Sequence, residues 1–490
     1  MRMNPLFLTD GYKTGHHQQY PKGTTLVYSN FTPRSNKYAP KGCEEVVSFG
    51  QQMIMQQIHE AFTNEFFNRP KDEVCGEMKR ELSMYLNTDY DVSHFEALHD
   101  LGYLPIAVKA IPEGTLVPIK VPVLTIYNTH PDFYWVTNYL ETIISNLLWK
   151  PITSATIAHQ YRKVLTSWQE KTDAERAWFI DWQGHDFSMR GMDSVDAVIS
   201  SGLGHLTSFH GSDSLPAIYG ARKFYKEDGF VAGSVNATEH SVMCAGTKED
   251  EVGTFRNLME TYPTGILSIV SDTWDLWKVC TEHVVTLKEE ILARDGKVVI
   301  RPDSGDPVDI ICGLNTSPDM YSAEQAMHPS FKGVVELLWD VFGGTVNEQG
   351  YKVLNDKIGA IYGDSITIDR ADEICKRLAS KGFASTNIVL GVGSFTYQYN
   401  TRDTFGFAMK ATYVEVNGEG REIFKNPITD DGTKKSATGL LRVAGDETCM
   451  LLEDRCTWEN EATGKLQIIY QNGRFENQTT LTEIRSKLCK

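Results

Sequence analysis

The chain has 490 residues, 41% of them hydrophobic and 23% charged, which are ordinary values for a globular protein of roughly two to four domains. Its 64 acidic residues outnumber 48 basic ones, and the net charge of -16 argues against a general nucleic-acid binder. No long apolar run occurs, and the opening segment MRMNPLFLTDGYK is too short and too polar for a signal peptide. We therefore expect a cytoplasmic protein that binds neither nucleic acid nor membrane.

The cysteines indicate neither a disulfide framework nor a zinc site. There are nine of them, an odd number, scattered from Cys43 to Cys489 without a C-x-x-C pair. We expect reduced thiols.

The segments before residue 150 are mixed, and the middle of the chain then alternates between strands and helices. Short apolar runs at 177–180, 266–270, 298–300, 358–362 and 388–390 predict strands, and each is followed by polar or glycine-rich residues. A helix is predicted at 371–381, with Ile374 and Leu378 on one face and Gly382 at its end. The segment 313–351 is polar and helical in patches, and we interpret it as an insertion that departs from the barrel. Repeated βα units of this kind close into a barrel whose strand ends gather on one face.

The last eighty or so residues predict antiparallel hairpins instead. Residues 409–416 and 421–424 flank Asn417-Gly418, and the run 466–470 precedes Asn472-Gly473. We therefore expect an α/β protein with two domains. Residues 151–404 would form an α/β barrel that carries the active site, and 1–150 with 405–490 a discontinuous, mixed α/β and antiparallel β domain.

The segment RPDSGDP follows the buried strand at 298–300, where an α/β enzyme presents its ligand-binding loops. Arg301 can grip a phosphate or a ribose hydroxyl, and Asp303 can accept ribose hydroxyls or hold Mg²⁺. The alternative is a strand-to-loop turn with a surface ion pair.

Two further segments place reactive groups after predicted strands. In SVNATEHS, Glu239 directly precedes His240, and histidine is the usual acid, base or nucleophile near neutral pH. The alternative is a hydrogen-bonded structural histidine. In HDFSMRG, Phe187 and Arg190 suit a flat heteroaromatic ligand, although a core phenylalanine and a surface arginine would give the same pattern.

Glycine turns and cations late in the chain are typical of phosphate binding. The G-x-G of GVGS lacks the further glycine and the early position of a dinucleotide fingerprint, so no Rossmann domain is predicted. The Lys434-Lys435 pair also fits a solvated loop. The candidate residues are Gly363, Asp364, Gly393, Ser394, Arg402, Lys410, Lys425 and Lys434.

Taken in order, the motifs of the chain resemble those of the nicotinamide phosphoribosyltransferases, type II phosphoribosyltransferases of NAD salvage. The resemblance runs from end to end, through TDGYKTGHHQQYP, YWVTNYLETIISNLLW, PITSATIA, HDFSMRG, GSDS, EHS, SDTWD, RPDSGDP, YGDSI, TRDTFGFAMK and IFKNP. It implies an irregular βα barrel, an additional antiparallel β-rich domain built from the N- and C-terminal segments, and a homodimer with shared active sites.

The resemblance also implies how the base is held. Nicotinamide would lie between Phe187 and Tyr12 of the partner subunit, with Arg190 and Ser268 lining the same pocket. Asp213 of GSDS would accept a hydrogen bond from the carboxamide and repel a carboxylate. Related nicotinate enzymes read GTSN there.

For phosphoribosyl pyrophosphate, the resemblance implies that Asp303 and Asp272 are the residues linked to Mg²⁺. Arg301, Gly363 and Asp364 would contact the ribose, and Gly393, Ser394 and Arg402 the 5′-phosphate. The cations that would meet pyrophosphate or phosphate are Arg34, Lys410, Lys425 and Lys434. His240 would be phosphorylated by ATP, with Glu239 and Asp272 orienting or activating it.

Three departures from the family pattern occur. A GSGGG-like turn reads GVGSF, HDFGYRG reads HDFSMRG, and Asn236 replaces a proline.

The enzymatic alternative is a nicotinate phosphoribosyltransferase, which Asp213 disfavours. The other alternative is a binding or signalling protein without turnover, for which loss of Asp303, His240 or Arg402 would be expected.

Overall fold

The computed structural model describes residues 3–315, 322, 327–363, 365–425, 429, 436–446 and 449–489. The chain divides into two compact units. Unit 1 comprises residues 1–156, 220–229 and 400–490, and unit 2 comprises 157–219 and 230–399. Among the described helices, none has the length and apolar character of a membrane span. All nine cysteines lie within the described residues, and none of them forms a disulfide.

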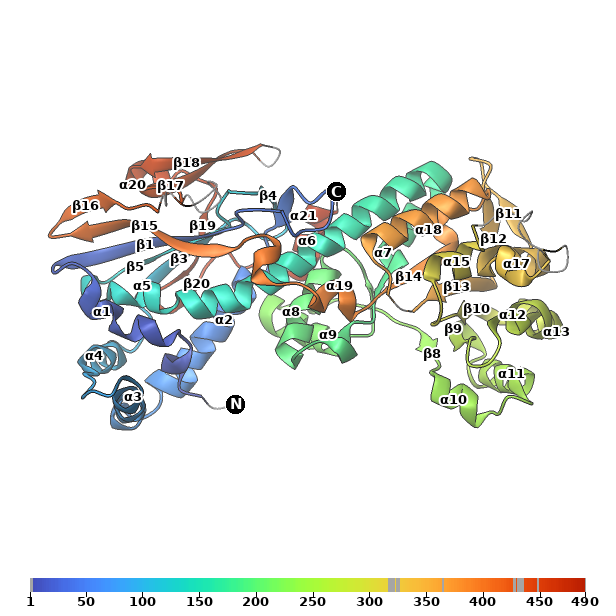
Figure 1. The fold of residues 1–490 in the computed structure, drawn as a ribbon, viewed down its shortest axis with the longest axis horizontal. Coiled ribbons are helices and arrows are strands. Elements are labelled where there is room, and N and C mark those ends of the chain that lie inside the picture. The colour runs from blue at the N-terminus through green and yellow to red at the C-terminus, as the bar shows by residue number, and fades with distance from the viewer. Residues whose placement is uncertain are drawn as a thin grey trace. The chain divides into compact units, whose positions relative to one another are not determined.

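Unit 1 is built on a seven-stranded antiparallel sheet that joins strands from both ends of the chain (Figure 1). In spatial order its strands are β16 (Glu419–Glu422), β15 (Ala408–Val416), β1 (Thr24–Thr32), β5 (Leu124–Asn128), β3 (Ile106–Ala110), β19 (Gln467–Gln471) and β20 (Arg474–Phe475). Two-stranded sheets accompany it, formed by β2 (Glu45–Val47) with β4 (Leu116–Pro118) and by β17 (Leu440–Gly445) with β18 (Met450–Cys456).

Strand β1 lies inside this sheet, and its alternating side chains pack on both faces, as the pleat dictates. Val27 packs with Val414 and Val416, while the neighbouring Tyr28 packs with Leu440 and Leu441.

Both hairpins predicted near the end of the chain are confirmed. Strand β15 pairs with β16 around Asn417-Gly418, and β19 pairs with β20 around Asn472-Gly473.

Figure 1 shows α1 (His16–Gln19), α2 (Gln51–Phe62), α3 (Lys71–Leu86), α4 (Ser93–Leu101) and α5 (Trp135–Tyr139) below the strands of this sheet, and α20 (Trp458–Glu461) above them beside β17 and β18. The last helix of the unit is α21 (Leu481–Leu488). The boundary after residue 156 falls inside the long helix α6 (Glu141–Thr172).

Unit 2 is built on a seven-stranded parallel sheet. Its order is β7 (Gly211–Ser212), β6 (Gly184–Asp186), β14 (Ile388–Val392), β13 (Ile358–Tyr362), β10 (Asp295–Arg301), β9 (Thr264–Val270) and β8 (Asn236–Ala237). A parallel bridge from Gly211 to Gly233, just ahead of β8, joins the two ends of the sheet. The sheet therefore curls into an irregular barrel, as predicted.

Helices surround the strands of this barrel (Figure 1). They are α7 (Ile180–Gln183), α8 (Val195–Leu206), α9 (Leu215–Tyr225), α10 (His240–Ala245), α11 (Glu251–Thr261), α12 (Leu276–Lys278), α13 (Val284–Thr286), α14 (Lys288–Ala293), α15 (Pro307–Cys312), α17 (Val334–Phe342), α18 (Ile368–Ser380) and α19 (Ser394–Gln398). A small hairpin, β11 (Gly344–Val346) with β12 (Lys352–Leu354), completes the unit. Helix α18 confirms the predicted amphipathic helix, because Ile374 and Leu378 are buried.

Two expectations about unit 2 are wrong. Residues 177–180 are helical, and the strand begins only at Gly184. A short apolar run is ambiguous by periodicity alone, and here Trp178 and Trp182 are spaced one helical turn apart. The segment 313–351 was also expected to depart from the barrel, but Val334, Val335 and Leu338 of α17 are fully buried in the core of the unit.

Candidate functional site

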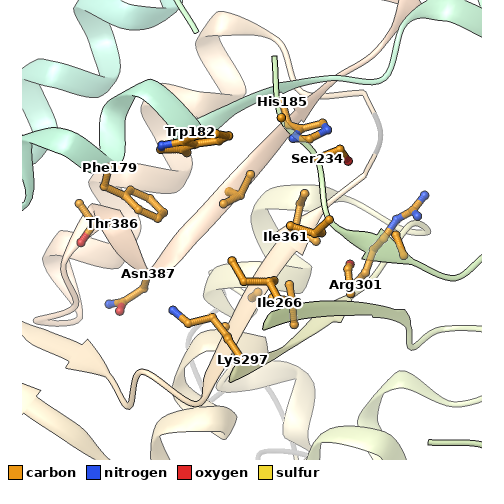
Figure 2. Close-up of a pocket in the computed structure, with 18 of the residues that line it drawn as sticks. Phe179, Trp182, His185, Ser234, Ile266, Lys297, Arg301, Ile361, Thr386 and Asn387 are labelled. Carbon is orange, nitrogen blue, oxygen red and sulfur yellow. The ribbon is translucent and has the colours of Figure 1, made fainter. Parts of the chain in front are cut away.

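A cavity of about 400 Å³ runs along the inside of the unit 2 barrel (Figure 2). Lys297, Val299 and Arg301 alternate along β10, so all three face the cavity. Figure 2 shows Arg301 at one end, near His185 and Ser234, and Lys297 nearer to Phe179 and Asn387. Arg301 marks the carboxyl end of the strand, where a parallel barrel presents its ligand-binding residues.

Aromatic and cationic groups meet at this carboxyl end. The Phe187 ring follows β6, and its centroid lies 4.5 Å from that of His185. The guanidinium carbon of Arg301 lies 5.5 Å from the Phe187 ring centroid. Gly391 leaves room for this ring, because a Cβ there would come within 2.8 Å of Phe187. The arrangement presents a flat ring and a cation to the cavity.

The Asp213 carboxylate lies in the cavity wall just after β7. Its Oδ1 accepts hydrogen bonds from Nε2 of His185 at 2.9 Å and from the Ser234 hydroxyl. Partial burial acts to raise the pKa of Asp213, but these two hydrogen bonds and the electrostatic influence of His185 and Arg301 lower it below its ordinary value. The carboxyl group is therefore held ionised.

The other two base-pocket candidates differ in position. Ser268, on β9, lines the cavity and is buried, and its hydroxyl has no hydrogen-bond partner among the described residues. Arg190 lies on an exposed helical turn, Met189–Gly191, outside the residues that line the cavity.

Two carboxylates and a histidine gather at the ends of β8, β9 and β10. Nε2 of His240 lies 3.9 Å from Oδ1 of Asp272 and 3.9 Å from Oδ2 of Asp303. The parallel pairing of β9 with β10, which sets Val270 opposite Arg301, brings the two aspartates together. Oδ1 of Asp272 is buried and takes no hydrogen bond from the described residues.

His240 is the first residue of α10, and its side chain is 48% exposed. Its Nδ1 lies 3.2 Å from Oγ1 of Thr273. The Glu239 carboxylate accepts a hydrogen bond from Ser241 and makes none with His240. The ring is therefore positioned by Thr273, which sequence reasoning missed.

Across the described ranges, no group of three or more His, Cys, Asp or Glu side chains could hold a metal ion by itself. Asp272 and Asp303 supply two carboxylates. Any metal there would need further oxygen ligands from a substrate or from water.

Gly363 follows β13 close to these groups. A Cβ there would lie 2.6 Å from Oδ1 of Asp303 and 3.0 Å from Nε of Arg301, so a larger residue would force these side chains to shift. Gly393 caps the short helix α19, and Ser394 begins it. The expectation for Asp364 lies outside the described residues.

The cationic candidates Arg34, Arg402 and Lys410 come together in unit 1. They line a second cavity of about 390 Å³. Burial is the main cause that lowers the pKa of Lys410, and the positive charges of Arg34, Lys425 and Lys13 act in the same direction against Glu141. Several cations confined in one cavity are suited to binding an anion.

The remaining unit 1 candidates are Tyr12, Lys425 and Lys434. Tyr12 is 66% exposed, on the helical turn Gly11–Gly15. Lys425 follows β16, and Lys434 lies outside the described residues.

Two family models match the chain. Residues 182–483 match the model of the nicotinate phosphoribosyltransferase family, and residues 4–105 match the nicotinamide phosphoribosyltransferase N-terminal domain. A nicotinamide phosphoribosyltransferase of Acinetobacter baylyi is 51% identical over 501 residues, covering 100% of this chain and 98% of the relative. One of Xanthomonas campestris is 33% identical over 494 residues, covering 99% and 97%.

Two solved structures share the fold. Nicotinate-nucleotide pyrophosphorylase from Pyrococcus furiosus superposes with a TM-score of 0.56 at 15% identity, covering 99% of this chain and 94% of that one. Human nicotinic acid phosphoribosyltransferase superposes with a TM-score of 0.55 at 16% identity, covering 98% and 93%. The fold is that of the type II phosphoribosyltransferases. The chain belongs to the nicotinate phosphoribosyltransferase family and, within it, to the nicotinamide phosphoribosyltransferases.

Proposed function

We propose that this protein transfers the 5-phosphoribosyl group of phosphoribosyl pyrophosphate to nicotinamide, giving nicotinamide mononucleotide and pyrophosphate. The observation that carries the proposal is the ionised Asp213 in the wall of the barrel cavity. A carboxylate accepts a hydrogen bond from a carboxamide NH₂ but repels the carboxylate of nicotinate. The 51% identity to a nicotinamide phosphoribosyltransferase along the whole chain supports the same substrate.

The nicotinamide ring stacks on Phe187, with Arg301 and Ser268 at its edge. Both side chains line the cavity, and the buried Ser268 hydroxyl and Nε of Arg301 have no hydrogen-bond partner among the described residues. Polar groups of this kind fix the orientation of a ligand in a mainly apolar pocket. Arg190 would have to turn inward to take part.

The ribose and its phosphates bind over the strand ends, at Asp303, Arg301 and Gly363. The closeness of Gly363 to Asp303 and Arg301 supports this placement, because all three lie together at the ends of the strands. The 5′-phosphate meets the amide groups at Gly393 and Ser394. Asp364 is proposed here from family resemblance alone.

Asp272 and Asp303 fit Mg²⁺. Mg²⁺ is commonly bound by one or two carboxylates together with substrate phosphates. Oδ1 of Asp272 is a carboxylate oxygen that accepts no hydrogen bond from the described residues, so it could coordinate the ion. When bound, the ion would neutralise charge that develops on the departing pyrophosphate. The role of the protein's own residues is to hold the sugar so that C1 faces the ring nitrogen of nicotinamide.

The chemistry needs positive charge where pyrophosphate leaves. As the bond to C1 breaks, the sugar becomes oxocarbenium-like and the leaving group gathers negative charge. The nicotinamide ring nitrogen then forms the new bond to C1. We assign stabilisation of pyrophosphate to Arg34, Arg402 and Lys410, which share one cavity in unit 1, and to the nearby Lys425. Lys434 joins them by resemblance.

We further propose that these cations and Tyr12 act across a homodimer, so that Arg34 of the partner subunit completes each site. The 66% exposure of Tyr12 supports a role in a contact with another molecule. A two-fold dimer would form two such sites.

ATP is the coupling substrate in this proposal, and His240 is its phosphoryl acceptor. The support is geometric, because the exposed imidazole lies between Thr273 and the two aspartates. A neutral, oriented imidazole is a competent nucleophile. Glu239, which contacts Ser241, would act only after a change of rotamer.

The direct test is to incubate the purified protein with phosphoribosyl pyrophosphate, Mg²⁺ and nicotinamide and to measure nicotinamide mononucleotide by mass spectrometry. Stoichiometric appearance of mononucleotide and pyrophosphate is expected, with a gain on addition of ATP. Formation of product from nicotinate alone would instead indicate a nicotinate phosphoribosyltransferase. Binding without turnover would indicate a non-catalytic protein.

A further inference from the structure

The Asp213 carboxylate is held from one side only. Both of its side-chain hydrogen bonds, from Nε2 of His185 and from the Ser234 hydroxyl, converge on Oδ1. Oδ2 receives no hydrogen bond from any part of the chain that the structure describes. An aspartate whose side chain is 43% exposed would otherwise rotate freely about its terminal bond. Two donors on one oxygen remove that freedom and define where the other oxygen points.

His185 is itself firmly held. It lies on β6, where it pairs with Gly211 of β7, and its side chain is only 10% exposed. The glycine is needed, because a Cβ at Gly211 would come within 2.7 Å of Nδ1 of His185. The ring also packs against Phe187 at 4.5 Å between centroids. To donate to an ionised carboxylate, Nε2 must carry the proton, so the contact selects one tautomer.

We propose that His185 is a positioning residue that, together with Ser234, fixes Asp213 so that its Oδ2 faces the base, and that His185 thereby sets the preference for a carboxamide over a carboxylate. This inference rests on the proposed function. Figure 2 shows His185 and Ser234 next to each other at the Arg301 end of the cavity. Neither donor needs to touch the base for this role, because each acts through Asp213.

His185 and Ser234 contribute in different ways. The histidine comes from a buried strand, whereas Ser234 is exposed and lies in the segment that leads into β8. The rigid donor therefore carries most of the positioning. Loss of a hydrogen bond to a charged acceptor that orients a substrate contact costs about tenfold or more in affinity.

The experiment compares His185→Leu, which keeps apolar bulk beside Phe187 but removes the donor, with His185→Gln, which keeps an N–H. Ser234→Ala removes the second donor. KM and kcat are measured separately for nicotinamide, nicotinate and phosphoribosyl pyrophosphate, and melting temperature reports on folding. His185→Leu should raise the KM for nicotinamide about tenfold and narrow the preference over nicotinate, without a matching change in KM for phosphoribosyl pyrophosphate. His185→Gln should restore most of the preference, and Ser234→Ala should give a smaller effect in the same direction.

A double-mutant cycle with Asp213→Asn separates positioning from a structural role. If His185 acts through Asp213, then His185→Leu should change base preference little once Asp213 is already asparagine. The inference would be overturned if the two substitutions had additive effects on base preference, or if His185→Leu left the KM for nicotinamide unchanged. It would also be overturned if His185→Leu raised the KM for nicotinamide and for phosphoribosyl pyrophosphate equally and His185→Gln rescued neither. Failure of the wild-type protein to use nicotinamide would instead overturn the proposed function.

Discussion

The backbone N–H of Asp303 donates a hydrogen bond to Oδ2 of Asp272 at 2.9 Å. The Ser304 hydroxyl donates to the same oxygen at 2.6 Å. Both donors occupy one oxygen of Asp272 and leave Oδ1 free of hydrogen bonds from described residues, at 3.9 Å from His240. The loop after β10 therefore orients the carboxylate at the end of β9, and the two aspartates form one unit.

The first prediction concerns Mg²⁺. Asp303→Asn removes a negative charge that the pair offers to a cation, so it should raise the Mg²⁺ concentration for half-maximal activity by about tenfold or more. Titration of activity with Mg²⁺ checks this. Asp295→Asn is the matched control, because Asp295 is an exposed aspartate at the other end of β10. An unchanged Mg²⁺ requirement in Asp303→Asn would contradict the assignment.

The second prediction concerns shared sites. Subunits carrying Tyr12→Ala and Arg34→Ala, and subunits carrying Asp303→Ala, should each be inactive alone. After subunit exchange, about half of the dimers are mixed and each has one intact site, so activity should recover to about a quarter of wild type. Exchange is verified with differently tagged subunits. Verified exchange without recovery would show that each chain builds its own site.

The third prediction concerns His240. His240→Ala should abolish both the ATP-driven gain in product and an acid-labile phosphoenzyme, while ATP-independent transfer remains because Asp272 and Asp303 are intact. Thr273→Val removes the contact at Nδ1 and should slow phosphorylation while leaving it detectable. Labelling with γ-labelled ATP followed by peptide mapping is the measurement. Label on another residue would exclude this role of His240.

The fourth prediction concerns stability. Burial raises the pKa of Glu113 to about 7, against the hydrogen bonds it accepts from the Gln52 amide and the Tyr225 hydroxyl. A folded-state pKa above the unfolded value means that the stabilisation is complete below about pH 4.5 and is lost as the pH rises through 7. Glu113→Gln has no charge to bury. Its unfolding free energy relative to that of wild type should therefore increase by about 2 kcal/mol as the pH rises from 5 to 8.

Urea unfolding across that range checks this, with Glu96→Gln as an exposed control. A difference between Glu113→Gln and wild type that does not vary with pH would show that Glu113 is ionised throughout.

Local patterns in the sequence were enough to predict much of the fold. The apolar run at 298–300 followed by RPDSGDP predicts a buried strand and its functional end, and β10 has both. Asn417-Gly418 predicts a hairpin because both residues tolerate positive φ, and they adopt 55° and 79°. The prediction of a strand at 177–180 was wrong because four apolar residues carry too little periodicity to distinguish a strand from a helix.

The supporting residues of the site could not be predicted in this way. His185 meets Asp213, and Ser234 meets the same carboxylate, only because β6, β7 and the segment before β8 lie side by side in the barrel. Thr273 reaches His240 across two strand ends in the same manner. Such contacts depend on parallel pairing between distant segments. A single sequence contains no local signal for them, although the HDF and SDT motifs mark where to look.

The central claim is that an ionised Asp213 makes this protein select nicotinamide. The most direct test offers nicotinamide and nicotinate at equal concentration, with phosphoribosyl pyrophosphate and Mg²⁺, to wild-type protein and to Asp213→Asn, and measures the ratio of the two mononucleotides. The wild type should form almost only nicotinamide mononucleotide, and Asp213→Asn should shift the ratio towards nicotinate by about tenfold or more, since a hydrogen bond to a charged acceptor contributes roughly 1.5 to 3 kcal/mol. A wild-type preference for nicotinate, or a ratio that the substitution leaves unchanged, would contradict the claim.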